Sequence, residues 1–198
     1  AALGHDPKSL DIVLIQMVRL VENGQEVKMS KRTGNAVTIR ELREDIGNDA
    51  TRYFFVERAV DTHMDFDLGL ARSQTSDNPV FYAQYAHARI CSVLRQAPEV
   101  QPRETYDLLG SEKETALLKH IAAFTDTVAD AAATYAPNKI CNYVQKLAQY
   151  FHSFYGAHKI LGNENAELTN QRLALLQATK ITLANALDLI GVSAPEKM

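Results

Sequence analysis

Residues 77–96, DNPVFYAQYAHARICSVLRQ, decide how most of this chain folds. Asp77 or Asn78 can cap the amino end of a helix, and Pro79 then stands at its first position, where a missing amide hydrogen costs nothing. Pro98 marks its end. Apolar residues between these limits follow the 3.6-residue helical period; they are Ala83, Ala86, Ile90, Val93 and Leu94. The stretch therefore predicts a long helix with one buried face.

The rest of the chain beyond this helix also carries only helical signals. Further helices are predicted over residues 112–133, 138–155 and 169–190, and Gly191 closes the last one. Long helices with short connections are typical of an α-helical bundle. Residues 71–198 are therefore expected to form an all-α domain.

Residues 1–70 show a different pattern, which predicts a mixed α/β portion. The Ile- and Val-rich run 10–20 predicts a strand and residues 26–28 predict a second one. Asn23-Gly24 between them favours a type I′ hairpin turn, which needs positive φ at both central positions. Because a two-stranded ribbon alone is marginal in water, we expect the hairpin to belong to a larger sheet.

Two helices are expected after this hairpin. Thr38 and Glu41 have the spacing of a capping box, and the helix that they open should stop at Gly47. Asp49 is then placed to cap a second helix that runs to about residue 59. The predicted fold class is mainly α, with a short α/β part before the bundle.

Composition excludes several classes of protein. The chain has 198 residues, of which 46% are hydrophobic and 23% are charged, so it is expected to be globular. It shows no apolar run of about 20 residues and no secretory signal. Two cysteines, Cys91 and Cys141, argue against a disulfide scaffold and fit a cytoplasmic protein. With a net charge of −3, any site for nucleic acid must be local.

No metal site is predicted. The histidines at 63, 120, 152 and 158 do not have ligand spacing, and no carboxylate pair completes a site. Asp65 and Asp67 could suggest an acid pair, but their position before a helix favours capping roles.

Residues 28–35, KMSKRTGN, are the sharpest chemical signal. Three cations within five residues lie on a loop predicted between a strand and a capped helix. Such a loop can fold over a polyphosphate and stabilise the charge that develops as pyrophosphate leaves, an effect of about 3 to 4 kcal/mol for one well-aimed group. A solvated basic loop is the plain alternative.

This loop resembles the K-M-S-K-S loop of class I aminoacyl-tRNA synthetases. Residues 49–54, DATRYF, are similar to the D-A-L-R-Y-F segment of arginyl-type enzymes, with Thr51 in place of Leu. Residues 65–68 and 78–89 resemble the opening of the arginyl-tRNA synthetase anticodon-binding domain, and residues 189–198 its carboxyl terminus. The resemblance covers essentially the whole chain. It implies that residues 1–70 are the last strip of a Rossmann-like catalytic domain and that residues 71–198 are the anticodon-binding domain.

The resemblance also implies roles and partners. In the parent enzyme, L-arginine would be joined to its tRNA through an arginyl-adenylate made from ATP with Mg²⁺, and tRNA is required for the first step. Lys28 and Lys31 would be catalytic. The ATP-binding residues would be Lys28, Met29, Ser30, Lys31 and Arg32. No membrane partner is expected, and the expected oligomeric state is a monomer.

Several side chains of the bundle are candidates for tRNA contact. Tyr82 and Tyr85 lie three apart on one helical face, where aromatic rings can stack unpaired bases; their spacing also fits a bundle core. The resemblance favours the RNA role and adds three positions. The predicted tRNA-binding residues are Tyr82, Tyr85, Arg89, Tyr155 and Met198.

The chain departs from the family in one respect, because no H-I-G-H motif is present and Gly4-His5 is the nearest fragment. We therefore expect these 198 residues alone to be inactive and limited to binding the anticodon loop. Two alternatives stay open. One is another class I synthetase, such as the cysteinyl type, and the other is a free-standing, non-catalytic RNA-binding bundle.

Overall fold

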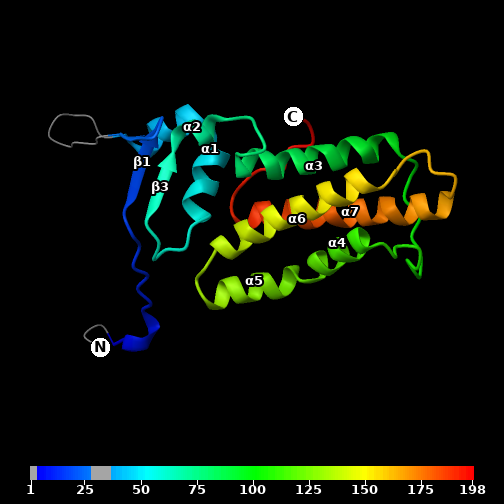
Figure 1. The fold of residues 1–198 in the computed structure, drawn as a ribbon. Coiled ribbons are helices and arrows are strands. Elements are labelled where there is room, and N and C mark those ends of the chain that lie inside the picture. Colours follow the sequence, from blue (N-terminus) through cyan, green and yellow to red (C-terminus); the bar gives the residue numbers. More distant parts are fainter. Residues whose placement is uncertain (1–3, 28–36) are drawn as a thin grey trace.

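A small three-stranded sheet opens the structure, a computed structural model that describes residues 4–27 and 37–198 (Figure 1). A 3-10 turn, Pro7–Ser9, precedes the strands Val18–Glu22 (β1), Gln25–Glu26 (β2) and Met64–Asp67 (β3). The order is β2-β1-β3, with β2 antiparallel and β3 parallel to β1. Asn23 and Gly24 have φ values of 52° and 75°, which confirms the predicted hairpin turn. The hairpin is thus part of a larger sheet, as expected.

The predicted strand over residues 10–20 is wrong for most of its length. Residues 10–17 have no regular structure, and Leu14 and Ile15 are exposed. A single backbone bond, from the Gln16 amide to the Val60 carbonyl at 2.9 Å, ties this run to the rest of the described chain. β-Branched composition alone does not make a strand, because a strand also needs a partner for its backbone groups.

The sequence reading also missed β3. Met64 and Phe66 are buried while Asp65 is exposed, which is the alternation of a half-buried strand. Asp65 is therefore not a cap; its carboxylate pairs across the ladder with Arg19, at 2.7 Å. Asp67 does cap the short helix Leu68–Arg72 (α2), as predicted, and accepts a hydrogen bond from the Leu70 amide.

Helix Ile39–Val56 (α1) connects β2 to β3 and begins with the predicted capping box. The Thr38 hydroxyl accepts from the Glu41 amide, and the Glu41 carboxylate accepts from the Thr38 amide. Gly47, with φ 83° and ψ 167°, is not helical and divides α1 into two helical segments, as the predicted stop at this residue requires. The segment after Gly47 ends at Val56, three residues before the predicted end.

Five helices form the bundle, and α6 runs through its middle (Figure 1). Its members are Pro79–Gln96 (α3), Glu112–Ala122 (α4), Phe124–Ala133 (α5), Asn138–Ala157 (α6) and Ala166–Leu189 (α7). Asn78 caps α3 by accepting from the Val80 and Phe81 amides, as predicted. The fold is mainly α, with the expected short α/β part.

One predicted helix, 112–133, is two helices that meet at Ala123. Both pack on α6, and α4 also packs on α7. Alanine favours the helix on both sides of the break and gives no local signal of it. The local sequence therefore does not predict this break.

The core is continuous from the sheet to the bundle. Tyr53 on α1 is fully buried, and its hydroxyl accepts a hydrogen bond from the Gln145 amide of α6 at 2.8 Å. Cys91 and Cys141 are buried and free, as expected, and burial raises the pKa of the Cys141 thiol to about 12. The division into domains at residue 70 stays a prediction.

Two absences concern the described ranges 4–27 and 37–198. Within them, no group of three potential metal ligands is found. No helix there is both long and apolar enough to cross a membrane.

Candidate nucleic-acid interface

Aromatic side chains from α3 and α6 form a cluster where these two helices pack together. Tyr82, Tyr85 and Arg89 lie on α3 at the i, i+3 and i+7 positions of one face, and His152 and Tyr155 lie three apart on α6. The Tyr82 and Tyr85 rings lie 4.9 and 6.0 Å from the His152 ring, centroid to centroid. Four of the five predicted tRNA-binding residues therefore belong to one cluster.

Arg89 joins the two helices at the open end of this cluster. Its guanidinium carbon lies 4.6 Å from the centroid of the Tyr155 ring and 5.8 Å from that of Tyr85. Its Nη1 also donates to the Tyr85 hydroxyl at 3.2 Å. In the described parts of the chain no carboxylate forms an ion pair with Arg89. The cluster thus presents one cation held against two rings.

The burial of the tyrosines suits a partner that approaches from solvent. Tyr85 is 40% exposed, while Tyr82 and Tyr155 are half-buried. Burial raises the pKa of the Tyr82 hydroxyl, which therefore stays a neutral hydrogen-bonding group at neutral pH. Each of the three tyrosines is therefore partly packed against protein and partly accessible to solvent. Such a surface can stack unpaired bases while the guanidinium contacts phosphate.

His152 is the member of this cluster that sequence analysis missed. The spacing of the histidines was tested only for a metal site. The i, i+3 relation of His152 to Tyr155 nevertheless indicates that the two rings share one face of the helix. Burial, with the nearby Arg89 charge, lowers the pKa of His152 to about 4, so the imidazole is neutral at neutral pH. Its Nε2 is buried and has no hydrogen-bond partner among the described residues.

We expect acid to destabilise the chain through His152. Because the folded-state pKa lies below the usual value of about 6.5, the unfolded chain binds the proton more readily, and stability is lost as pH falls from 6.5 towards 4. His152→Phe should make the free energy of unfolding less dependent on pH in this window. Denaturant titrations at pH 7 and pH 5 measure this, with the exposed His63→Phe as control. An equal pH dependence in His152→Phe and the unsubstituted chain would contradict the assignment.

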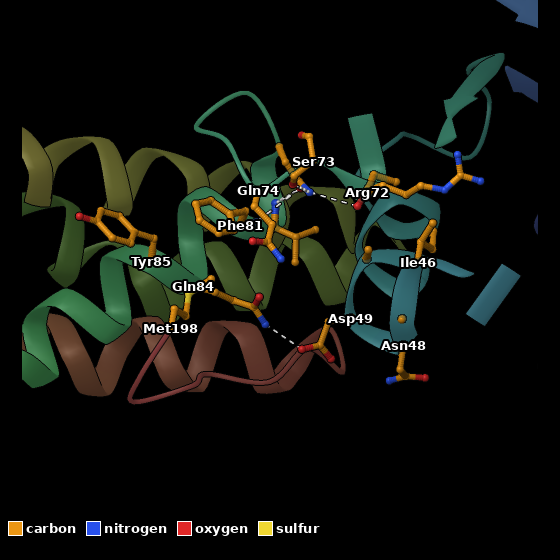
Figure 2. A pocket seen from close by; sticks show the side chains of 15 residues that line it. Ile46, Asn48, Asp49, Arg72, Ser73, Gln74, Phe81, Gln84, Tyr85 and Met198 are labelled. Carbon is orange, nitrogen blue, oxygen red and sulfur yellow. Dashed lines mark hydrogen bonds between the residues drawn. The ribbon is translucent and has the colours of Figure 1, made fainter. Parts of the chain in front are cut away.

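Met198, the fifth predicted residue, lies in an adjoining open cleft of about 730 Å³ between α1, the start of α3 and the segment that follows α7. Figure 2 shows Met198 beside Gln84, with Tyr85 and Phe81 along the same wall. The Phe81 and Tyr85 rings stack with centroids 6.1 Å apart. Tyr85 therefore belongs to the aromatic cluster and also lines this cleft, and it connects Met198 with the other three residues.

The predicted phosphate-binding residues cannot be placed in the same way. Lys28, Met29, Ser30, Lys31 and Arg32 all lie outside the described residues. The structure shows only what flanks them: β2 before the loop and the capping box of α1 after it. The predicted strand–loop–helix setting is thus present on both sides.

A helical bundle that carries a cluster of aromatic rings and a cation has the groups with which RNA-binding domains stack unpaired bases. The DALR anticodon binding domain family matches residues 83–198, more than half of the chain, and the chain belongs to this family. Among curated relatives, it is 55% identical to the arginine–tRNA ligase of Bacillus subtilis and 56% identical to that of Bacillus licheniformis. Both matches cover all of this chain and 36% of the relative, so the chain spans about a third of their length.

Solved structures agree with this assignment. A Campylobacter jejuni protein described as an arginyl-tRNA synthetase superposes on 99% of this chain and 43% of its own, with a TM-score of 0.86 and 33% identity. The Thermus thermophilus arginyl-tRNA synthetase covers 90% of this chain and 34% of its own, with a TM-score of 0.75 and 27% identity. The predicted resemblance to arginyl-tRNA synthetases is confirmed.

Proposed function

We propose that this chain is the anticodon-reading part of an arginine–tRNA ligase, together with the strip of catalytic domain that carries the phosphate loop. One observation carries the proposal: Tyr82, Tyr85, Arg89 and Tyr155 form one cluster on α3 and α6. The relatives that match the whole chain are named arginine–tRNA ligases, and such enzymes use ATP. Transfer RNA, ATP and L-arginine are the proposed substrates of the intact protein.

The cluster supplies two kinds of interaction to an RNA loop. Tyr85 and Tyr155 offer ring faces on which splayed bases stack, and the guanidinium of Arg89 offers charge-assisted hydrogen bonds to phosphate oxygens. Because Arg89 already lies against both rings, few rotamers need to be frozen when RNA binds. This cluster therefore favours a single-stranded RNA loop over a base-paired helix, because the bases of a helix are already stacked and are not available to the tyrosine rings.

The phosphate chemistry belongs to the loop at residues 28–32. We propose that Lys28 and Lys31 bind the phosphates of ATP and stabilise the charge of the departing pyrophosphate. Met29, Ser30 and Arg32 would complete this site. No group of three potential metal ligands is found among the residues described. Mg²⁺ in such enzymes would be held mainly by the phosphates of ATP and its own waters.

Tyr155→Ala tests the RNA role of the cluster in the intact ligase. Loss of one stacking face is worth about 1 to 3 kcal/mol, so KM for tRNA should rise about 5- to 100-fold. The kcat at saturating tRNA should change little, because Tyr155 is not expected to contact the reacting atoms. Steady-state aminoacylation with purified arginine-specific tRNA measures both constants.

Tyr106→Ala is the matched control, since Tyr106 is an exposed tyrosine in the loop between α3 and α4. An unchanged KM for Tyr155→Ala would remove Tyr155 from the interface. Charging of the tRNA with cysteine, or no charging at all by the intact protein, would support the two alternative functions instead.

A further inference from the structure

The segment after α7 folds back onto α3. Gly191, with φ 71°, ends α7, and the Val192 amide returns to the Leu187 carbonyl at 3.0 Å, as in a Schellman motif. Val192 is then buried, which fixes the direction in which the chain leaves the helix. A side chain at position 191 would place its Cβ 3.0 Å from Arg52 of α1. The exit from α7 is therefore shaped by α1 as well as by local turn chemistry.

Two charged residues of α1 hold this exit. Arg52 donates from Nε to the Ile190 carbonyl at 2.9 Å. One turn earlier, the Asp49 carboxylate accepts hydrogen bonds from the Ser193 hydroxyl and from the Gln84 side-chain amide, the latter at 2.7 Å. Figure 2 shows the Gln84–Asp49 bond crossing from α3 to α1.

Gln84 of α3 completes a junction between α1, α3 and the segment 192–198. The same Nε2 lies 3.0 Å from the Ser193 carbonyl. α1, α3 and the segment 192–198 therefore meet at one half-buried carboxylate, Asp49. Hydrogen bonds to a carboxylate are charge-assisted and stronger than neutral ones, so Asp49 is a strong link of this junction.

Further contacts keep the segment along α3 until it reaches the cleft. The Pro195 carbonyl lies 2.9 Å from Nδ1 of His87, and the Glu196 carbonyl accepts from Arg95 at 3.1 Å. The Glu196 carboxylate also pairs with Lys180 of α7 at 2.8 Å. Met198 then lies in the cleft, which Gln84 and Tyr85 also line.

We propose that Asp49 is a positioning residue for RNA binding, one that acts through the segment 192–198 and α3 and does not touch RNA itself. Its carboxylate helps to fix Met198 and Tyr85 relative to each other before RNA arrives. An interface that is ordered in advance loses less entropy on binding. Without this carboxylate, the Gln84 amide and the Ser193 hydroxyl lose their shared acceptor, and fewer contacts hold the segment that places Met198 beside Tyr85. The inference rests on the proposed function and adds to it the way the RNA surface is assembled.

Asp49→Ala in the intact arginine–tRNA ligase tests this inference. KM for arginine-specific tRNA should rise about tenfold, which corresponds to about 1.4 kcal/mol, while kcat at saturating tRNA should stay within about twofold. Asp49→Asn keeps one acceptor oxygen and should recover part of the affinity. Asp130→Ala is the control, because Asp130 is a carboxylate on α5 that pairs only with a nearby residue, Lys139.

A double-variant cycle separates positioning from a general structural role. Met198→Ala should also raise KM for tRNA. If Asp49 acts through Met198, Asp49→Ala combined with Met198→Ala should be no worse than the larger single effect, whereas independent effects would multiply. A multiplied effect, or an unchanged KM in Asp49→Ala, would overturn the inference.

Three further outcomes distinguish the positioning role of Asp49 from the proposed function. If Asp49→Ala does not fold, Ser193→Ala replaces it in the cycle, since it removes one donor of the junction and leaves α1 and α3 unchanged; the same non-multiplied result is then expected. If Tyr155→Ala raises KM but Met198→Ala does not, the RNA surface stands and the positioning role of Asp49 is refuted. If neither changes KM, the proposed function itself fails.

Discussion

Replacing Lys31 with Ala in the intact ligase should lower kcat for aminoacylation by about 100-fold or more. The reason is electrostatic: one preorganised cation at the departing pyrophosphate contributes about 3 to 4 kcal/mol to the transition state. KM for tRNA should be nearly unchanged, because the RNA surface lies on α3 and α6. Steady-state aminoacylation, and ATP–pyrophosphate exchange measured with tRNA and arginine present, report the loss.

The control for this prediction is Lys113→Ala, which removes an exposed lysine from α4. Lys31→Arg should restore only part of the rate, since a planar guanidinium does not replace a compact, flexible ammonium. A nearly unchanged kcat in Lys31→Ala would exclude Lys31 from the catalytic site.

The second large effect concerns stability and arises from a buried ion pair in the bundle. Arg172 of α7 donates from Nε to the Glu114 carboxylate of α4 at 2.8 Å, and the exposed fractions of these side chains are 11% and 2%. Burial alone would raise the pKa of Glu114, but hydrogen bonds from Ser111 and Arg172 lower it, so the carboxylate is ionised at neutral pH. The Arg172 guanidinium also donates to the Lys159 carbonyl at 3.2 Å.

We expect Arg172→Ala to lower the free energy of unfolding by about 3 to 5 kcal/mol, because it leaves the Glu114 charge buried and unpaired. Denaturant titration of the chain at pH 7 measures this. The control is Arg103→Ala, which breaks an exposed ion pair with Glu167 and should cost at most about 1 kcal/mol. Equal losses in the two variants would show that the Arg172–Glu114 pair is solvated rather than buried.

Much of the fold follows from local signals in the sequence. The Asn78 cap with Pro79, the Thr38 capping box and the Asn23-Gly24 turn all appear where the sequence predicts them. These signals act through backbone groups within a few residues, so they are visible without tertiary structure. The strand predicted over residues 10–20 does not form at residues 10–17. Strand formation depends on a partner that is distant in the sequence, so local signals do not decide it.

The candidate interface was only partly predictable. The helical face of α3 and the family resemblance gave Tyr82, Tyr85 and Arg89, and the structure brings Tyr155 against them. His152 was missed because its role depends on burial between two helices, which lowers its pKa. No pattern near Asp49 indicates that its carboxylate bonds to Ser193, which is 144 positions away in the chain.

The sequence by itself determined where α3, α4 and α6 begin and the family to which the chain belongs, and it predicts the phosphate-loop residues. Those features are encoded in short segments, through caps, turns and motif order. Only the tertiary structure decided the break at Ala123, the pairing of β3 with β1, the aromatic cluster and the junction at Asp49. Each of these depends on side chains or strands that are far apart in sequence, and their meeting is set by how the whole core packs.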